Sequence, residues 1–309
     1  MNDTRLTEPE GQTPATGPAY SSIWSDLAAT EFTQGFITAA GYRTRFIHAG
    51  QDSDPVLLLL HGVTGHAEAY VRNLAAHAQY FSVWAIDLIG HGWSAKADHP
   101  LEITHYVDHV LGFLDAIGAE HAAVSGESLG GWVAARLAAD HPKRLDRVVL
   151  NTMGGTMANP EVMERLSTLS MEAARDPSWA RVRTRLEWLM ADPDQVTDDL
   201  IRTRQAIFQQ PGWLKACGHT MALQDPAIRR RNMITDDDLR AVAVPALVLW
   251  TTKDPSGPVG EAERLANLIP GSTFAVMEDC GHWPQWEDPN TFNRLHLDFL
   301  RAGHEKRQR

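Results

Sequence analysis

The chain has 309 residues, of which 43% are hydrophobic and 22% charged, close to the averages of globular proteins. This length fits one large α/β domain or two smaller ones. The formal net charge of −11 argues against sequence-independent nucleic-acid binding, which needs clustered Lys and Arg. Cys217 and Cys280 are the two cysteines, too few for a disulfide framework and in no zinc spacing, so we expect a reducing, cytoplasmic setting.

Residues 1–31 are predicted to form a flexible N-terminal arm. The first twenty residues carry three prolines among Thr, Glu and Gly and lack the basic-then-apolar layout of a secretory signal. The longest apolar run, Val56 to Leu60, is far too short to span a bilayer. The sequence therefore predicts no membrane partner.

From residue 32 onward, β-prone apolar segments alternate with segments of helical spacing. Two short strands are expected within 32–50, and buried strands at 56–62, 81–92, 121–128, 147–155, 246–255 and 272–279. The helical segments are 68–80, 103–119, 129–142, 260–269 and 290–300. Continuous apolar strands alternating with helices predict an α/β fold with a mostly parallel sheet covered on both faces.

The alternation stops near residue 155 and resumes at residue 246. The stretch between is helical in pattern, rich in Met, Arg, Trp and Leu, and interrupted by prolines. We interpret 156–237 as a helical cap, or lid, inserted into a core made of 32–155 and 238–309. A compact two-domain arrangement is the alternative.

Ser128 lies in the motif Gly126-Glu127-Ser128-Leu129-Gly130, directly after a predicted strand and before a predicted helix. A serine at so sharp a turn presents its hydroxyl at the carboxyl edge of the sheet, and the flanking glycines allow the tight bend. We therefore predict that Ser128 is a nucleophile. The competing interpretation is an ordinary glycine-rich turn.

A nucleophilic serine needs a base and an acid that orients the base. His282 lies in the loop after the last strand, and Asp254 ends the strand before it. The chain order Ser, Asp, His and the shared sheet edge predict a Ser128–His282–Asp254 triad. A structural histidine and a turn-forming aspartate are the competing interpretations.

The tetrahedral intermediate of such a triad needs two N–H donors for its negative oxygen. We predict the backbone N–H groups of Leu129, after the nucleophile, and Val63, in the loop after the first parallel strand, where Gly62 permits close approach. The segment Asp87–Gly92 lacks the lysine of a phosphate loop. No HExxH or CxxC motif is present, and neither a metal nor another cofactor is predicted.

These motifs together resemble the α/β-hydrolase superfamily, with an inserted helical cap. The C-terminal stretch CGHWPQWEDPNTFNRLHLDFL is similar to that of meta-cleavage-product hydrolases, which cleave a carbon–carbon bond in 2-hydroxy-6-oxohexa-2,4-dienoate-type products of aromatic ring fission. The resemblance implies that Arg204, with Arg202 as its neighbour, grips the substrate carboxylate and that Trp283 lines the pocket. It also implies a homodimer and a small-molecule substrate.

Two features depart from that family pattern. The loop after the first strand is HGVTGH rather than a longer glycine-rich sequence, and Glu127 stands where Asn is common beside the substrate. Carbon–carbon bond hydrolysis is therefore weighed against a carboxylesterase or lactonase with the same triad, acting on a small apolar ester. A non-enzymatic binding role is disfavoured because all three triad positions are intact.

Overall fold

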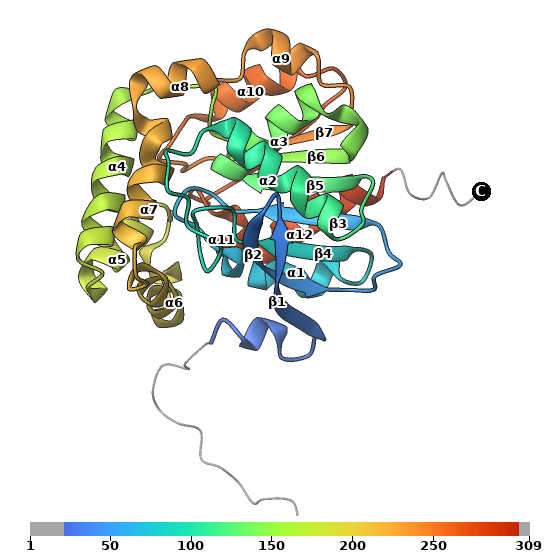
Figure 1. The fold of residues 1–309 in the computed structure, drawn as a ribbon. Coiled ribbons are helices and arrows are strands. Elements are labelled where there is room, and N and C mark those ends of the chain that lie inside the picture. Colours follow the sequence, from blue (N-terminus) through green and yellow to red (C-terminus); the bar gives the residue numbers. More distant parts are fainter. Residues whose placement is uncertain (1–21, 303–309) are drawn as a thin grey trace, which may run out of the picture.

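The computed structural model describes residues 22–302, which contain one eight-stranded sheet (Figure 1). The strand order is β1-β2-β4-β3-β5-β6-β7-β8; β1 pairs with β2 and β2 with β4 antiparallel, and all other pairs are parallel. The strands are β1 (Phe32–Ala39), β2 (Tyr42–Ala49), β3 (Val56–Leu60), β4 (Ser82–Ile86), β5 (Ala122–Glu127), β6 (Leu145–Asn151), β7 (Ala246–Thr251) and β8 (Thr273–Met277). The predicted mostly parallel sheet is confirmed.

Helices cover both faces of this sheet. The helices outside the inserted segment are α1 (Val71–His77), α2 (Ile103–Ala116), α3 (Leu129–Asp140), α9 (Asp236–Arg240), α10 (Val259–Leu268), α11 (Pro284–Glu287) and α12 (Pro289–Arg301). On one face α2, α3 and α10 pack against the strands, and on the other α1 and α12 do so (Figure 1). The fold is the expected α/β architecture.

Strand β3 explains why both faces must be covered. Its leucines alternate between two hydrophobic clusters: Leu57 and Leu59 join one, and Leu58 and Leu60 join the other. Successive side chains of a strand point to opposite faces, so a run of leucines requires apolar partners on both sides. The carboxyl end of β3 is thereby fixed deep in the molecule, beside the end of β5.

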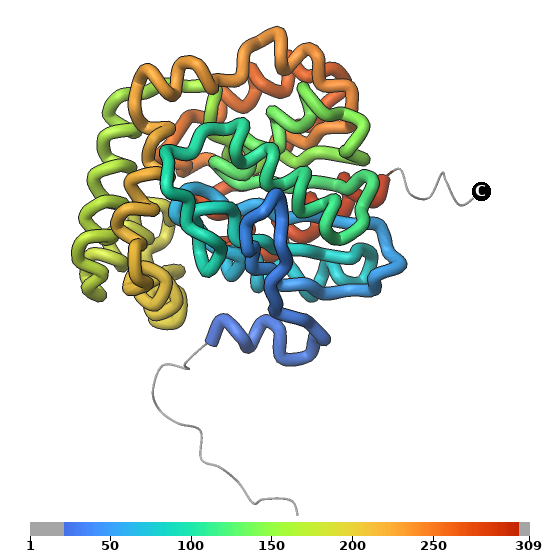
Figure 2. Tube along the Cα trace, viewed as in Figure 1, coloured from blue at the N-terminus to red at the C-terminus, as the bar shows by residue number. Residues whose placement is uncertain are grey.

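The inserted segment leaves the sheet after β6 and returns before β7. It contains α4 (Pro160–Arg175), α5 (Trp179–Glu187), α6 (Asp198–Phe208), α7 (Trp213–Thr220) and α8 (Pro226–Asn232). Figure 2 follows the chain from the core into this yellow-green to orange group on one side of the molecule and back. The predicted end of the cap, residue 237, falls inside α9, which contacts α3 and α10 of the core.

Residues 22–31 are part of the region predicted as a flexible arm, and they are folded. They contain a short helix, η1 (Ser25–Leu27), and bury Ile23 and Leu27. The backbone N–H of Ile23 donates to Asp199 at the start of α6, at 3.1 Å. Two apolar side chains four residues apart give this segment an anchor on the hydrophobic core. The rest of the predicted arm, residues 1–21, lies outside the described residues.

No helix within residues 22–302 is both long and apolar enough to cross a membrane. The homodimer and the cytoplasmic setting stay predictions.

Candidate active site

Ser128 occupies the bend between β5 and α3, with φ 54° and ψ −109°. Such a positive φ is strained for a residue with a side chain and persists only when the surroundings impose it. The motif glycines provide those surroundings: a Cβ on Gly126 would lie 2.1 Å from the carbonyl carbon of Gly130, and one on Gly130 would lie 2.2 Å from the carbonyl oxygen of Leu60. Only glycines let β3, β5 and α3 approach closely enough to hold this bend.

His282 and Asp254 meet at the same edge of the sheet. The Nδ1 atom of His282 lies 2.9 Å from Asp254 Oδ1, so the imidazole N–H donates to the carboxylate. Ser256 Oγ lies 3.2 Å from the same nitrogen, and the Ser256 backbone N–H donates to Asp254 Oδ1 at 2.8 Å. The carboxylate thus fixes the tautomer in which Nε2 is left for other chemistry.

The loop that carries His282 is fastened to the cap. The His282 backbone N–H donates to the carbonyl of Leu189, which follows α5, at 2.6 Å. The half-buried Glu287 side chain accepts from the N–H of Gly281 at 2.9 Å and from that of Ala191 in the cap at 2.7 Å. One carboxylate therefore ties the histidine loop to the inserted segment.

The free side of the imidazole faces Glu127. His282 Nε2 lies 3.2 Å from Glu127 Oε1, whereas no hydrogen bond between His282 and Ser128 occurs in the part of the chain described. The other oxygen, Glu127 Oε2, accepts from the backbone N–H of Gly62 at 2.6 Å. Glu127 Oε1 thus lies within ion-pair distance of the nitrogen that a nucleophilic serine would use, although it accepts no hydrogen bond among the described residues.

Burial and these contacts raise the pKa of both Glu127 and His282. Burial raises the pKa of Glu127 to about 7, against the lowering effect of His282 and the Gly62 N–H. Burial lowers the pKa of His282, but the charge and hydrogen bond of Asp254 and the charge of Glu127 outweigh it and raise the pKa to about 8. Groups that titrate near pH 7 suit proton transfer.

Ser128 stands between two cavities. The first, called here the apolar cavity, is rich in apolar side chains, among them Trp132, Met153, Met157, Met163 and Leu166, although Arg229 also lines it. The second, called here the polar cavity, brings the ionisable groups of Glu127, Arg185 and His282 together with apolar side chains such as Trp188 and Trp283. Ser128 and Val63 line both, so a ligand at Ser128 can place an apolar part on one side and a polar part on the other.

The predicted oxyanion donors lie beside the serine. Leu129 and Val63 both line the apolar cavity with Ser128, and neither backbone N–H has an acceptor among the described residues. His61 orders the Val63 loop: its Nε2 accepts from Leu88 N–H at 3.1 Å, which leaves Nδ1–H to donate to the Gly62 carbonyl at 2.7 Å. Free N–H groups at a helix start can stabilise a developing negative charge.

Arg204 and Trp283 come together next to the polar cavity. Arg204, on α6, is fully buried, and its Cζ lies 5.4 Å from the Trp283 ring centroid. None of its three guanidinium nitrogens has a hydrogen-bond partner within residues 22–302. Arg202 is exposed and stacks near Trp179 instead. Of the two arginines, the one facing the interior is Arg204.

Residues 55–289 match the model of the alpha/beta hydrolase fold family. The chain belongs to that family. It is a hydrolase, and its matches include a 2-hydroxymuconate semialdehyde hydrolase of Pseudomonas putida, 33% identical over 273 residues that cover 85% of this chain and 92% of the relative.

Solved structures agree on the fold of this hydrolase. A meta-cleavage product hydrolase from Pseudomonas fluorescens has a TM-score of 0.76 at 28% identity, covering 87% of this chain and 97% of that one. An enol-lactonase from Burkholderia xenovorans has a TM-score of 0.73 at 22% identity, covering 86% and 99%, and shows the shared fold alone. Solved structures with this fold therefore include a meta-cleavage product hydrolase and an enol-lactonase.

Among the charged side chains that line the polar cavity, the sequence did not single out Arg185. Arg185, on α5, is 1% exposed and lines the polar cavity with Ser128 and His282. The sequence signal for its burial was the helical spacing of its neighbours. Val182 lies three residues before Arg185 and Leu186 one residue after it, and both are buried on the inner side of α5. Within the described residues, no group of three His, Cys, Asp or Glu could hold a metal ion.

Proposed function

We propose that this hydrolase cleaves a carbon–carbon bond in a 2-hydroxy-6-oxohexa-2,4-dienoate-type substrate, with Ser128 as nucleophile, His282 as proton carrier and Asp254 as the acid that orients it. The observation that carries the proposal is the Arg204 guanidinium, buried beside Trp283 with no partner among residues 22–302. A buried arginine is costly unless an anion pairs with it, and a carboxylate fits its two-pronged geometry. The similarity to the Pseudomonas hydrolases supports the same substrate class.

The two cavities fit the two ends of such a molecule. The carboxylate end would lie in the polar cavity near Arg204 and Trp283, and the apolar substituent in the methionine-rich cavity. The ketone carbon between them would then lie at Ser128, which lines both. This placement gives each part of the substrate surroundings of matching polarity.

The chemistry needs proton transfer before bond cleavage. The conjugated enol must first become a ketone, because its new carbonyl then accepts the electron pair of the breaking bond. Ser128 loses its proton to His282 Nε2 and adds to the remote ketone, whose oxygen would be bound by the N–H groups of Val63 and Leu129. The carbon–carbon bond then breaks with its electron pair moving to the new carbonyl, and the resulting dienolate oxygen takes up the proton that His282 holds. Water, losing its proton to His282, releases the acyl group as an acid, and His282 returns that proton to Ser128.

Hydrolysis of a small apolar ester or lactone is the second candidate. The observation that favours it is Glu127, whose carboxylate at 3.2 Å from His282 Nε2 would repel a substrate enolate if it stays ionised. The same triad would serve, and the apolar cavity would hold the acyl group. Arg204 would then have no anion to bind.

The test compares a phenyl-substituted dienoate with p-nitrophenyl butyrate in the wild type, Ser128→Ala, Arg204→Met and the exposed control Arg202→Met. We expect Ser128→Ala to abolish both activities. Arg204→Met should lower kcat/KM for the dienoate by about 10-fold or more, since a charge-assisted pair is lost, and leave the ester nearly unchanged. Undetectable dienoate cleavage, with ester turnover indifferent to Arg204, would favour the esterase.

A further inference from the structure

A second buried arginine stands at the polar cavity. Arg185 projects from α5, and its Nε donates to Ser170 Oγ of α4 at 3.0 Å. Its Nη1 is buried and has no hydrogen-bond acceptor among residues 22–302. Because Arg185 lines the cavity together with Ser128 and His282, a bound molecule can reach this guanidinium.

Arg185 and Arg204 stand on two helices that pack together, α5 and α6, and both lie near Trp283: its ring centroid is 5.4 Å from Arg204 Cζ, and it lines the polar cavity with Arg185. The charge of Arg185 contributes, after burial, to lowering the pKa of Arg204 to about 9, and burial lowers the pKa of Arg185 to about 10. Both remain cations at neutral pH. The interior beside the nucleophile thus holds two like charges, and neither guanidinium forms a salt bridge with the described carboxylates.

The neighbouring groups do not neutralise this pair. Glu127 acts on both arginines, but it forms a salt bridge with neither: its Oε2 accepts from the Gly62 N–H, and its Oε1 lies 3.2 Å from His282 Nε2. The Cys217 thiol lies close to both, yet burial raises its pKa to about 12, so it is uncharged at neutral pH. Two unpaired buried cations are unfavourable in the free protein, and binding of an anion offsets that cost.

We propose that Arg185 and Arg204 form a two-arginine subsite for a dianionic head group, in which two negatively charged oxygen groups lie side by side. The proposal deepens the proposed function and rests on it for the placement of the substrate. Each guanidinium presents a planar fork that pairs with one anionic group, so a single carboxylate would leave one fork unused. Arg185 is then the residue that selects a doubly charged head over a single carboxylate.

Two kinds of molecule share this chemistry. A dicarboxylate supplies two carboxylates, and a 2-hydroxydienoate supplies one carboxylate and, once its enol ionises, an adjacent negative oxygen. In the proposed reaction Arg185 would hold the second of these, which offsets the repulsion that Glu127 exerts on an enolate. A neutral ester group at this position would meet two unpaired charges and bind poorly.

Calorimetric titration tests the subsite without any turnover. Oxalate, with two adjacent carboxylates, and acetate, with one, are titrated into the wild type, Arg185→Met, Arg204→Met and the exposed control Arg202→Met. We expect oxalate to bind the wild type about 10-fold or more tightly than acetate, and Arg185→Met to remove that preference while acetate binding changes little. Arg204→Met should weaken both anions, and Arg202→Met neither.

An equal affinity of the wild type for oxalate and acetate would overturn the proposal, and so would a preference that survives Arg185→Met. Methionine matches the length of the arginine stem, and loss of an unpaired buried charge should leave Tm unchanged or higher. If the methionine variant does not fold, Arg185→Lys replaces it, because lysine keeps the charge but lacks the planar guanidinium that pairs with an anionic group at two points. An undiminished preference of Arg185→Lys for oxalate would then contradict the subsite.

Turnover separates this inference from the proposed function. A wild type that prefers oxalate through Arg185 but does not cleave the dienoate retains the subsite and rejects carbon–carbon cleavage. A wild type that cleaves the dienoate without an oxalate preference retains the reaction and rejects the subsite.

Discussion

Glu127 is the residue that sets this site apart. It precedes the predicted nucleophile, is fully buried, and bridges the Gly62 N–H and His282 Nε2. With its pKa raised to about 7 and that of His282 to about 8, the two form a buried ion pair between these values. A protonated imidazole cannot accept the proton of Ser128, so this contact opposes catalysis at neutral pH.

This pair predicts a specific pH dependence. The kcat/KM of the wild type should rise with pH and level off above about 8, as His282 loses its proton. Glu127→Gln removes a negative charge that stabilises the imidazolium, so the pKa of His282 falls and the rise moves to lower pH. The pH–rate profile measures the shift, with the exposed Glu263→Gln as control. Superimposable profiles for Glu127→Gln and the wild type would refute the coupling.

Sequence reasoning at this scale reached the residues but not their contacts. The motif around Ser128 and the chain order located His282 and Asp254, and the 2.9 Å bond between the latter two agrees with that placement. The contact between Glu127 and His282 Nε2 depends on the directions of two side chains that follow different strands. The hydrophobic periodicity of the sequence does not determine those directions. Arg185 was missed because α5 carries three arginines, and only its burial separates it from Arg181 and Arg183.

At the scale of elements, the bend between β5 and α3 depends on close backbone approach. Gly130 lies at the start of α3 directly over the end of β3, with the Leu60 carbonyl oxygen 2.2 Å from where a Cβ would stand. Gly260 is also helical, in α10, but has open space around it. The two glycines therefore form a matched pair with opposite expectations.

Gly130→Ala should destabilise the fold by about 1–3 kcal/mol, because the strand and helix must separate. Gly260→Ala should be neutral or stabilise by up to about 1 kcal/mol, since alanine favours a helix. Urea unfolding midpoints of the two variants provide the comparison. Equal midpoints would show that the tight bend imposes no steric demand.

The elements were predictable where their apolar pattern is continuous. All predicted strands occur, because buried parallel strands require unbroken apolar runs such as β3 and β7. The predicted end of the cap, residue 237, lies inside α9. The run of acidic residues there does not indicate whether the helix packs on the cap or on the core. The fold of residues 22–31 escaped prediction because only two apolar side chains, Ile23 and Leu27, anchor it.

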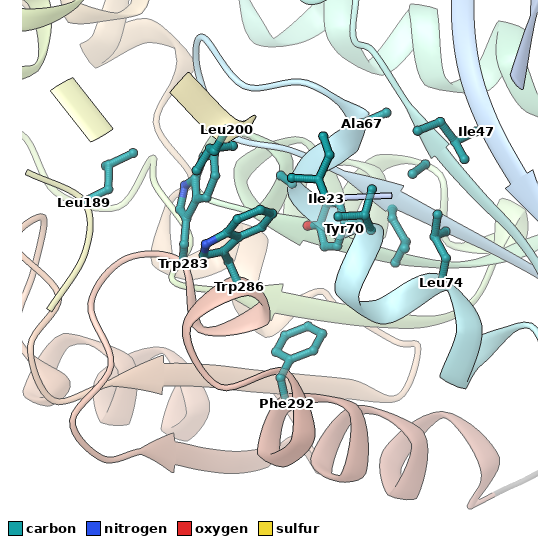
Figure 3. Packing of buried hydrophobic residues seen from close by; sticks show 14 of the residues in the cluster. Ile23, Ile47, Ala67, Tyr70, Leu74, Leu189, Leu200, Trp283, Trp286 and Phe292 are labelled. Carbon is teal, nitrogen blue, oxygen red and sulfur yellow. The ribbon is translucent and has the colours of Figure 1, made fainter. Parts of the chain in front are cut away.

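Side chains of the cap and of the core belong to one hydrophobic cluster, which joins the two parts of the molecule. Leu189 and Leu200 of the inserted segment join Trp283 and Trp286 of the histidine loop, as Figure 3 shows. The backbone bond from His282 to Leu189 and the Glu287 carboxylate add polar links across the same boundary. The position of the imidazole is thus coupled to the seating of the cap.

Glu287→Gln tests that coupling. The variant loses the charge and one of the oxygens that accept from Gly281 and Ala191, so the histidine loop should loosen. We expect kcat to fall by about 10-fold, the equivalent of one charge-assisted hydrogen bond, with KM little changed. Steady-state kinetics measures it, and the exposed Glu278→Gln is the control. A lowered Tm with unchanged kcat would limit Glu287 to a structural role.

The central claim is that Ser128 attacks the substrate carbonyl with help from His282. Mass spectrometry of the enzyme after reaction with a fluorophosphonate examines it most directly. We predict one adduct, on the peptide that contains Ser128, absent from Ser128→Ala and formed far more slowly by His282→Ala. An adduct on another residue, or inactivation of Ser128→Ala at the wild-type rate, would contradict it.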